Sequence, residues 1–238
     1  VIGHDPLRQF LVAGPNGRFQ TLEACWDPHK SEWFNVYGDE DRKPGEWGHW
    51  TGRGMVWNQM CASCHNTRVR KNYDAATDHT TMAEMTVSCE SCHGGMKAHV
   101  DWQAKYKGSG QKDPTVVKFT RDQTIDSCAP CHTRRGELTG DFKPGDLFAD
   151  HYSMSIVDHT DIYFPDGQVR DENYEFGSFH SSRMFHAGVR CVDCHDPHSG
   201  VVQLRKAGEP TTRVQCAECH YQEVGRHKVP EHAALGLT

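Results

Sequence analysis

Apolar residues occur along this chain in short clusters rather than in long periodic stretches. Two such clusters, residues 9–13 and 18–22, flank the strong turn sequence Gly14-Pro-Asn-Gly17 and predict a β-hairpin. A second small hairpin is predicted for residues 162–169, where Asp166-Gly167 separates β-forming residues. Between the two hairpins the pattern favours short helices.

Polar segments separate the apolar clusters. Residues 39–45 are predicted to form a loop and residues 107–114 a linker, because both are rich in turn-forming residues. We therefore expect a fold class that is mainly α, with much irregular coil and small β-hairpins.

The composition is poor in core-forming side chains. Leu, Ile, Val and Phe make up about 17% of the 238 residues, a share in the range usually found in disordered chains. Such a chain buries too little apolar surface to offset the conformational entropy lost on folding. A folded protein of this composition needs a further apolar component in its core.

The cysteines indicate what that component is. Ten of the eleven fall into five copies of a Cys-x-x-Cys-His unit: Cys61, Cys64 and His65; Cys89, Cys92 and His93; Cys128, Cys131 and His132; Cys191, Cys194 and His195; and Cys216, Cys219 and His220. Two thiols at this spacing can reach the two vinyl groups on one edge of a porphyrin. One turn of helix between them then places the following histidine under the ring, where it can reach the iron. The unit is typical of c-type haem attachment.

Structural zinc and disulfide bonds are the alternatives to haem. Neither needs a histidine immediately after every cysteine pair, so both leave the five histidines unexplained. We therefore predict five covalently attached haems c, one on each unit, and expect the porphyrins to form the core.

Charge and hydropathy limit the partners. The formal net charge is −6, and the haem propionates would bring the oxidised holoprotein to about −11, which argues against nucleic acid as a partner. The sequence has no apolar run long enough to span a membrane and no signal peptide. Because haem is attached to such units outside the cytoplasm, we expect an extracytoplasmic protein, periplasmic or extracellular, whose leader has been removed.

We interpret residues 1–238 as one multihaem domain. Residues 1–48 form a haem-free hairpin region and residues 49–238 the five-haem region, in which two close pairs of units bracket a middle one. Cys25 is the one cysteine outside the units. It is interpreted as an unpaired buried thiol, with an intermolecular disulfide as the alternative.

Several stretches, most of them outside the units, carry a resemblance to known proteins. They include His49-Trp-Thr-Gly-Arg53, Trp57-Asn58, Lys71-Asn-Tyr-Asp74, Pro165-Asp-Gly-Gln168, Gly177-Ser-Phe179 and, most specifically, Cys191-x-x-Cys-His-Asp-Pro-His-Ser199. These stretches resemble the multihaem cytochromes often fused to tetratricopeptide repeats, a group related to the hydroxylamine oxidoreductase superfamily. The chain is also similar in kind to the subunits of extracellular cytochrome filaments.

The sequence departs from that group in three respects. It has none of the further haem units that members of this group usually have upstream of the position corresponding to Val1, it has no tetratricopeptide array, and it has a short tail where relatives have a further haem unit after His220. A catalytic centre formed by those parts is therefore not implied.

Ten histidines are candidate iron ligands. The five unit histidines supply the proximal ligands. Distal candidates are His198, which Pro197 directs away from its own haem, and His99, which follows a Gly-Gly bend; the resemblance implies His49 and His151 and is similar at His186. His227 and His232 are substitutes for the last of these. Met184 is a sterically plausible rival, but with twelve histidines outside the units, bis-histidine coordination is the simpler prediction.

Two functions remain open at this point. In the first, the chain is an electron carrier rather than an enzyme, with every iron between two histidines and with redox proteins as partners. In the second, one open haem acts as a reductase or oxidase of small nitrogen or sulfur compounds, in a pocket near Arg68, Lys71 and Tyr73. Assembly is also open, between a monomeric shuttle and a homo-oligomer or head-to-tail filament.

Overall fold

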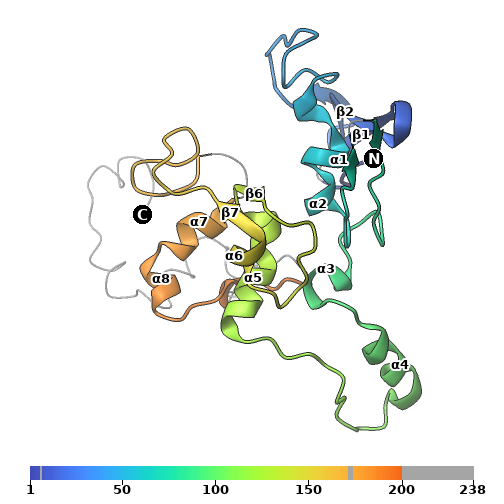
Figure 1. Ribbon diagram of the computed structural model, residues 1–238, viewed down its shortest axis with the longest axis vertical. Coiled ribbons are helices and arrows are strands. Elements are labelled where there is room, and N and C mark those ends of the chain that lie inside the picture. The colour runs from blue at the N-terminus through green and yellow to red at the C-terminus, as the bar shows by residue number, and fades with distance from the viewer. Residues whose placement is uncertain (6, 75, 171–173, 200–238) are drawn as a thin grey trace. The chain divides into compact units, whose positions relative to one another are not determined.

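The computed structural model describes residues 1–199 except residues 6, 75 and 171–173. The chain divides into an N-terminal part, residues 1–178, and a C-terminal part, which begins at residue 179, and each is described by itself. Short helices and three small antiparallel sheets alternate along the described residues of the N-terminal part, joined by coil (Figure 1). Helix and strand are thus more evenly mixed than the predicted, mainly α class. Whether the chain acts as a single domain stays a prediction.

The N-terminal part begins with a three-stranded antiparallel sheet in the order β1-β2-β3. Its strands are β1 (Arg8–Ala13), β2 (Phe19–Asp27) and β3 (Glu32–Asn35). The predicted first hairpin is confirmed, since Ala13 pairs with Phe19 across the turn. Asn16 (φ 59°) and Gly17 (φ 80°) adopt the left-handed conformation, which these two residue types tolerate best.

Asn58 fastens the first haem unit to this sheet. It lies in α1 (Trp57–Met60), directly before the unit, and its side chain is 1% exposed. Its Oδ1 accepts from the Phe19 N–H at 2.8 Å, and its Nδ2 donates to the Gly17 carbonyl at 3.2 Å and to Thr80 Oγ1 at 3.0 Å. The sheet therefore holds the start of the first unit in place.

The remaining elements of the N-terminal part are short. The strands are β4 (Tyr73–Asp74) paired with β5 (Thr77–Asp78), and β6 (Arg135–Glu137) paired with β7 (Tyr152–Met154). The helices are η1 (Pro15–Gly17), η2 (Arg53–Met55), α2 (Ala62–His65), α3 (Cys89–His93), α4 (Lys97–Tyr106), α5 (Arg121–His132), α6 (Phe148–His151) and α7 (Glu175–His180). Helix α7 extends two residues into the C-terminal part.

Helix α5 begins at a capping box. Gln123 N–H donates to Thr120 Oγ1, and the Thr120 N–H donates to Gln123 Oε1. The helix buries Ile125 and Ala129, and Asp126 accepts from the backbone N–H of Phe148 at 3.1 Å, which joins α5 to α6. Figure 1 shows α5 and α6 beside the β6–β7 ladder.

The C-terminal part is described for residues 179–199. It holds α8 (Arg183–His186) and α9 (Cys191–Cys194). The start of α9 is fixed by Asp193, whose carboxylate accepts from the Arg190 backbone N–H at 2.8 Å and pairs with the Arg190 guanidinium at 2.6 Å.

The second predicted hairpin is reduced to a single bridge. Tyr163 and Val169 form an isolated bridge around a turn in which Gly167 N–H donates to the Phe164 carbonyl at 2.9 Å, and no strand forms on either side. The turn signal at Asp166-Gly167 was therefore correct, but too few residues flank it to form a ladder.

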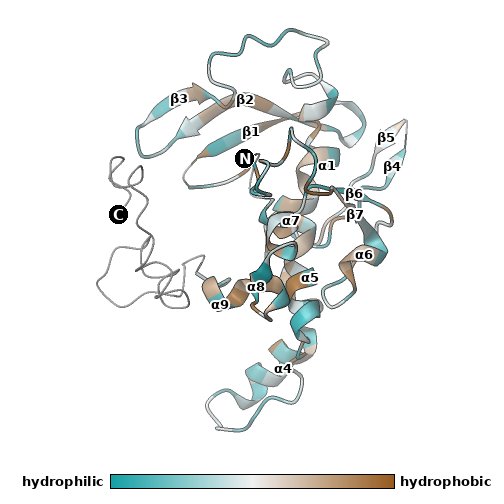
Figure 2. Cartoon of the chain, turned by 90° about the vertical axis from the view of Figure 1, so that its left-hand side faces the viewer, coloured by the Kyte–Doolittle hydropathy of each residue, from teal (hydrophilic) through white to brown (hydrophobic). Residues whose placement is uncertain are grey.

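Protein side chains form only a small core. The buried apolar residues include Cys25, Trp57, Ile125, Phe148 and Tyr163. In Figure 2 the apolar stretches are short and lie mainly on β2, α5 and α9. The burial of Cys25 confirms the interpretation of a buried thiol, and burial raises its pKa to about 11. None of the helices in the described part of the chain is long and apolar enough to cross a membrane.

Candidate haem-binding sites

Each of the four units that the structure describes forms one helical turn. Cys61 caps α2, the second unit is α3 itself, the third ends α5, and the fourth is α9 followed by His195. The N–H of His65 donates to the carbonyl of Cys61 at 3.2 Å, and that of His195 to Cys191 at 2.9 Å.

The fifth unit cannot be compared with the other four. Its predicted attachment residues, Cys216 and Cys219, and its predicted proximal ligand, His220, lie outside the described residues. The helical turn of the other units is therefore not extended to Cys219 or its neighbours. A haem on this unit stays a prediction from the sequence.

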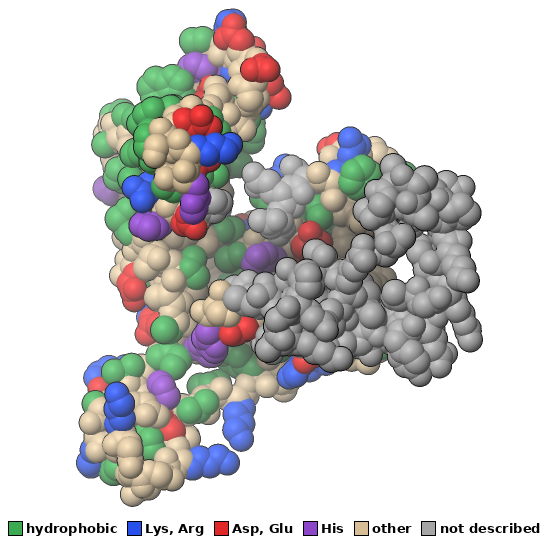
Figure 3. All heavy atoms as spheres, turned by 180° about the vertical axis from the view of Figure 1, so that it is seen from behind, with side chains coloured by type: hydrophobic (Ala, Val, Ile, Leu, Met, Phe, Trp, Pro, Cys, Tyr) green, Lys and Arg blue, Asp and Glu red, His purple; other side chains and the backbone are tan. Residues whose placement is uncertain are grey.

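The chemistry of the described units fits a porphyrin. No cysteine of a described unit forms a disulfide bond, and the unit histidines, His65, His93, His132 and His195, are exposed rather than packed into protein. Histidine side chains are visible at several places on the face in Figure 3. Among the described residues, no three histidine, cysteine or acidic side chains gather around a point where they could hold a metal ion.

A groove beside the first unit supports the same fit. It has a volume of about 540 Å³, and Met60, next to Cys61, lies in its wall together with Trp47, Arg18 and Arg53. The Nε of Arg18 is buried and has no hydrogen-bond partner among the described residues. The wall mixes apolar and polar side chains and also contains Asp74. Its apolar side chains suit a flat apolar ring, and its two guanidinium groups suit the carboxylates that the ring carries.

The hydroxyl of Thr67 joins the first unit to the second. Thr67 is fully buried two residues after His65. Its Oγ1 donates to the Thr86 carbonyl at 2.6 Å, accepts from the Ser88 N–H at 2.9 Å, and lies 2.9 Å from Ser91 Oγ within the second unit. The segment after the first unit is therefore fixed to the helix that carries the second.

The first unit also meets the third. Cys64 Sγ donates to the Pro130 carbonyl at 3.7 Å. A hydrogen bond between the two thiols lowers the pKa of Cys64 and raises the pKa of Cys131. The Arg135 Nε donates to the same Pro130 carbonyl at 2.5 Å, next to the two thiols. Two attachment sites that are far apart in sequence thus adjoin in space.

Among the distal candidates, His99 has a carboxylate partner on one ring nitrogen. It is part-buried on α4, and its Nδ1 lies 2.8 Å from Asp113 Oδ2. Burial alone would raise the pKa of Asp113, but hydrogen bonds from Thr115, Gln103 and His99 outweigh it and hold the pKa below its usual value. Asp113 belongs to the predicted linker, yet its side chain is only 6% exposed.

Among the distal candidates that the structure describes, His49 is the most buried, at 9% exposure. Its Nδ1 lies 2.8 Å from Thr51 Oγ1 and accepts from the Thr51 N–H at 3.2 Å. Because a backbone N–H can only donate, this arrangement favours a proton on Nε2. Iron ligation through Nε2 would require the proton to move to Nδ1, where the Thr51 hydroxyl could accept it.

His151 has partners on both ring nitrogens. Nδ1 lies 2.5 Å from Thr139 Oγ1 and 3.4 Å from Asp141 Oδ1, while Nε2 lies 3.4 Å from Asp146 Oδ2. For His151 to bind iron through Nε2, Asp146 would have to move away.

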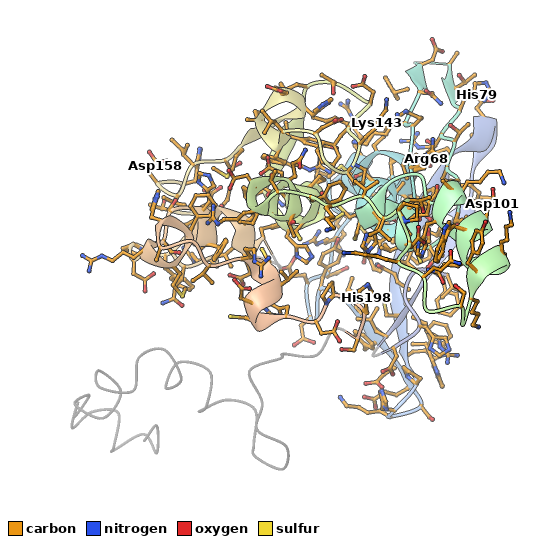
Figure 4. The ribbon with its side chains drawn as sticks, turned by 90° about the horizontal axis from the view of Figure 1, so that it is seen from below. Arg68, His79, Asp101, Lys143, Asp158 and His198 are labelled. Atoms are coloured by element: carbon orange, nitrogen blue, oxygen red, sulfur yellow. The ribbon has the colours of Figure 1, made fainter. Side chains whose placement is uncertain are left out.

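The two remaining distal candidates, His186 and His198, lie in the C-terminal part of the chain and are exposed. The ring of His186 contacts Phe185 edge-on at 5.4 Å. His198 is 80% exposed and follows a turn in which Asp196 accepts from its N–H at 3.0 Å (Figure 4). His227 and His232, the substitutes, lie outside the described residues. Bis-histidine ligation therefore stays a prediction at every site.

Both cations of the alternative catalytic pocket are paired with carboxylates. Arg68 pairs with Glu90 at 3.3 Å, and Lys71 pairs with Glu137 at 2.7 Å. Tyr73 lies on β4 and is 67% exposed. Arg68 also adopts a left-handed φ of 53°.

Three large apolar side chains that precede the first haem unit differ in their exposure. Trp57 is 2% exposed and packs edge-on against Phe19 at 5.8 Å, so it belongs to the protein core. Trp50 and Met60 are 37% and 48% exposed and remain available to a haem.

Comparison with known proteins gives a partial match. The family model described as cytochrome c554 and c-prime matches residues 46–94, which span the first two units and His49. No curated protein matches the chain.

Two solved structures are similar. The outer cell wall cytochrome OcwA has a TM-score of 0.51 at 18% identity over 87% of this chain, which spans only 44% of the OcwA chain. The undecahaem cytochrome from the S-layer of Carboxydothermus ferrireducens has a TM-score of 0.36 at 15% identity. That likeness covers 90% of this chain and 35% of the undecahaem cytochrome chain. The first likeness shows the fold. With the units and the family match, it supports a multihaem c-type cytochrome.

Proposed function

We propose that this chain is an extracytoplasmic electron carrier that holds five covalent haems c, each iron between two histidines. The ten cysteines of the units would attach the porphyrins, and His65, His93, His132, His195 and His220 would be the proximal ligands. When bound, haem supplies a one-electron centre that alternates between ferric and ferrous iron. The protein contributes the attachment, the axial ligands and the burial that set the potential.

The observation that carries this proposal is the contact between the first and third units. A thiol that attaches haem lies at the porphyrin edge, so the approach of Cys64 to Cys131 supports two haem edges that adjoin. Thr67 fixes the second unit beside the first. Adjoining attachment sites suit passage of electrons within the chain and give no advantage to a single open catalytic site.

The reductase or oxidase hypothesis has less support. Its cations, Arg68 and Lys71, are both engaged by carboxylates, so a substrate anion would have to displace Glu90 or Glu137. We therefore favour a carrier that is not an enzyme, with redox proteins as its partners.

An extracytoplasmic location follows from covalent haem attachment, which takes place outside the cytoplasm. The name of the similar outer cell wall cytochrome agrees with it. The relation to the tetratricopeptide-associated group and assembly into a head-to-tail filament both stay predictions. Electron microscopy of native material distinguishes ordered polymers from the particles of a monomeric shuttle.

The haem count is tested by the intact mass under denaturing conditions. We expect five haems in the natural chain, five in Cys25→Ala, which alters a cysteine outside the units, and four where Cys191→Ala is combined with Cys194→Ala. The fifth unit is tested in the same way, since Cys216→Ala combined with Cys219→Ala should also leave four. Four or fewer haems in the natural chain would contradict the count.

The ligation is tested by low-temperature EPR of the oxidised protein. If two histidines hold every iron, all signals are low-spin. A high-spin ferric signal from intact protein would show an open site and would restore the catalytic hypothesis.

A further inference from the structure

Helix α4 and the segment after it form a built carboxylate site around His99. His99 and Gln103 lie one helical turn apart on the same face of α4. Both reach Asp113 Oδ2, His99 Nδ1 at 2.8 Å and Gln103 Nε2 at 3.2 Å. The carboxylate is thus aimed at one particular ring nitrogen.

The other carboxylate oxygen is held from the opposite side. Asp113 Oδ1 accepts from the Thr115 N–H at 2.7 Å and from Thr115 Oγ1 at 2.6 Å. With two donors on one oxygen, two on the other and 6% of the side chain exposed, Asp113 is a fixed hydrogen-bond acceptor.

We propose that Asp113 is the positioning residue of His99, accepting a hydrogen bond from Nδ1–H and so presenting the Nε2 lone pair to a haem iron. An ionised carboxylate can only accept, so the proton of a neutral ring must sit on Nδ1, which leaves Nε2 unprotonated. Among the described residues, no hydrogen bond or ion pair engages Nε2 of His99. The inference rests on the proposed function, because it requires His99 to be an iron ligand.

His99 differs in this respect from the other part-buried candidates. The Nδ1 of His49 is approached by a backbone donor, and the Nε2 of His151 faces Asp146. In His99, one nitrogen is held by an acceptor and the other is open. This is the pattern by which outer-shell carboxylates orient histidines that bind metals.

The pairing also has an electronic consequence. A carboxylate on Nδ1 makes the imidazole a stronger electron donor, and a stronger donor favours ferric over ferrous iron. The haem that His99 ligates should therefore have a lower reduction potential than it would without Asp113.

The experiment compares four variants of the haem-loaded chain by voltammetry and EPR, with the haem count of each checked by mass. His99→Met identifies the redox wave of the haem in question, because methionine ligation raises its potential. Asp113→Asn removes the charge with little change of shape, and Asp113→Glu restores it. Asp101→Asn is the matched control, since Asp101 lies on the same helix, is 61% exposed and pairs only with Lys97 among the described residues (Figure 4).

We expect Asp113→Asn to move the wave identified by His99→Met upward and to leave the other waves in place. A tenfold change in the preference for ferric iron corresponds to 59 mV for a one-electron couple. Asp113→Glu should return the wave toward its natural position, and Asp101→Asn should move nothing. A high-spin EPR signal in Asp113→Asn would also support the proposal, because it would report release of His99.

Two results would overturn the proposal, and they are distinguishable. If His99→Met moves a wave and Asp113→Asn moves none, His99 is a ligand but Asp113 does not position it. If neither variant moves a wave, His99 is not a ligand, and the proposal fails while the five-haem count stands on the mass alone. Should Asp113→Asn lose haem or fail to fold, a wave in Asp113→Glu at its natural potential supports the proposal and a wave displaced as far as in His99→Met rejects it.

Discussion

Thr67→Val should destabilise the junction between the first two haem units without changing its shape. The Thr67 hydroxyl donates to the Thr86 carbonyl, accepts from the Ser88 N–H and contacts the hydroxyls of Ser88 and Ser91 at 3.1 and 2.9 Å. Valine replaces this hydroxyl with a methyl group of similar size. The variant therefore removes hydrogen bonds and leaves no cavity.

The cost can be estimated from the groups that lose their partner. The Ser88 N–H belongs to a half-buried residue and would lose its acceptor, which costs about 1–3 kcal/mol. Thr86 is exposed, so its carbonyl can bind water instead, and the two serine hydroxyls can rotate toward other acceptors, so these groups add little. We expect the free energy of unfolding to fall by about 2 kcal/mol.

Guanidinium unfolding of the haem-loaded chain, followed by haem absorbance and circular dichroism, measures this change. Thr160→Val is the matched control, because Thr160 is exposed and its hydroxyl has no partner among the described residues; its effect should stay within about 0.5 kcal/mol. If the two variants unfold at the same denaturant concentration, the Thr67 hydroxyl does not join the two units and the reasoning is refuted.

Two further predictions concern cysteines. Cys25 should resist iodoacetamide at pH 8 to 9 in the folded protein, because it is fully buried and burial raises its pKa to about 11; a mass increase in the native protein would contradict this, and labelling in denaturant is the positive control. Cys128→Ser combined with Cys131→Ser should remove one haem and also shift the redox wave assigned to the first unit by His65→Met, because Cys64 and Cys131 adjoin. An unshifted wave would separate the two sites.

Local signals in the sequence were enough to predict the first hairpin and the helical turn of each described unit. Gly14-Pro-Asn-Gly17 supplies the two residues that enter the left-handed region, and the three-residue spacing of the cysteines requires one turn of helix. Both features depend only on residues that are neighbours in the chain.

The arrangement of the units could not be predicted in the same way. The spacing along the chain suggested two close pairs around a middle haem, yet the third unit lies against the first through Cys64 and Pro130. Asp113 was assigned to a linker because residues 107–114 are polar, and only the fold brings it to His99. An aspartate in a Gly-rich segment shortly after a candidate histidine is a weak signal that could have been noticed.

The segment from residue 68 to residue 120 shows most clearly why this chain needs its haems. Among the described residues of this segment, no apolar residue is buried, and Val87, Val100, Val116 and Val117 are each at least 50% exposed. By contrast, β2 and α1 have a protein core of their own around Cys25 and Trp57. Porphyrins that cover the exposed valines would stabilise the segment by roughly 25 cal/mol for each Å² of apolar surface removed from water.

Removing the second haem should therefore loosen this segment selectively. In Cys89→Ser combined with Cys92→Ser, we expect hydrogen exchange to accelerate over residues 86–118 and to stay slow over β1 and β2, because the sheet and its core do not depend on that haem. Hydrogen-exchange mass spectrometry compares the two regions within one sample, so the sheet is its own control. Equal exchange rates before and after the substitution, over residues 86–118, would mean that the polypeptide alone holds this segment and that its exposed valines have no haem to cover them.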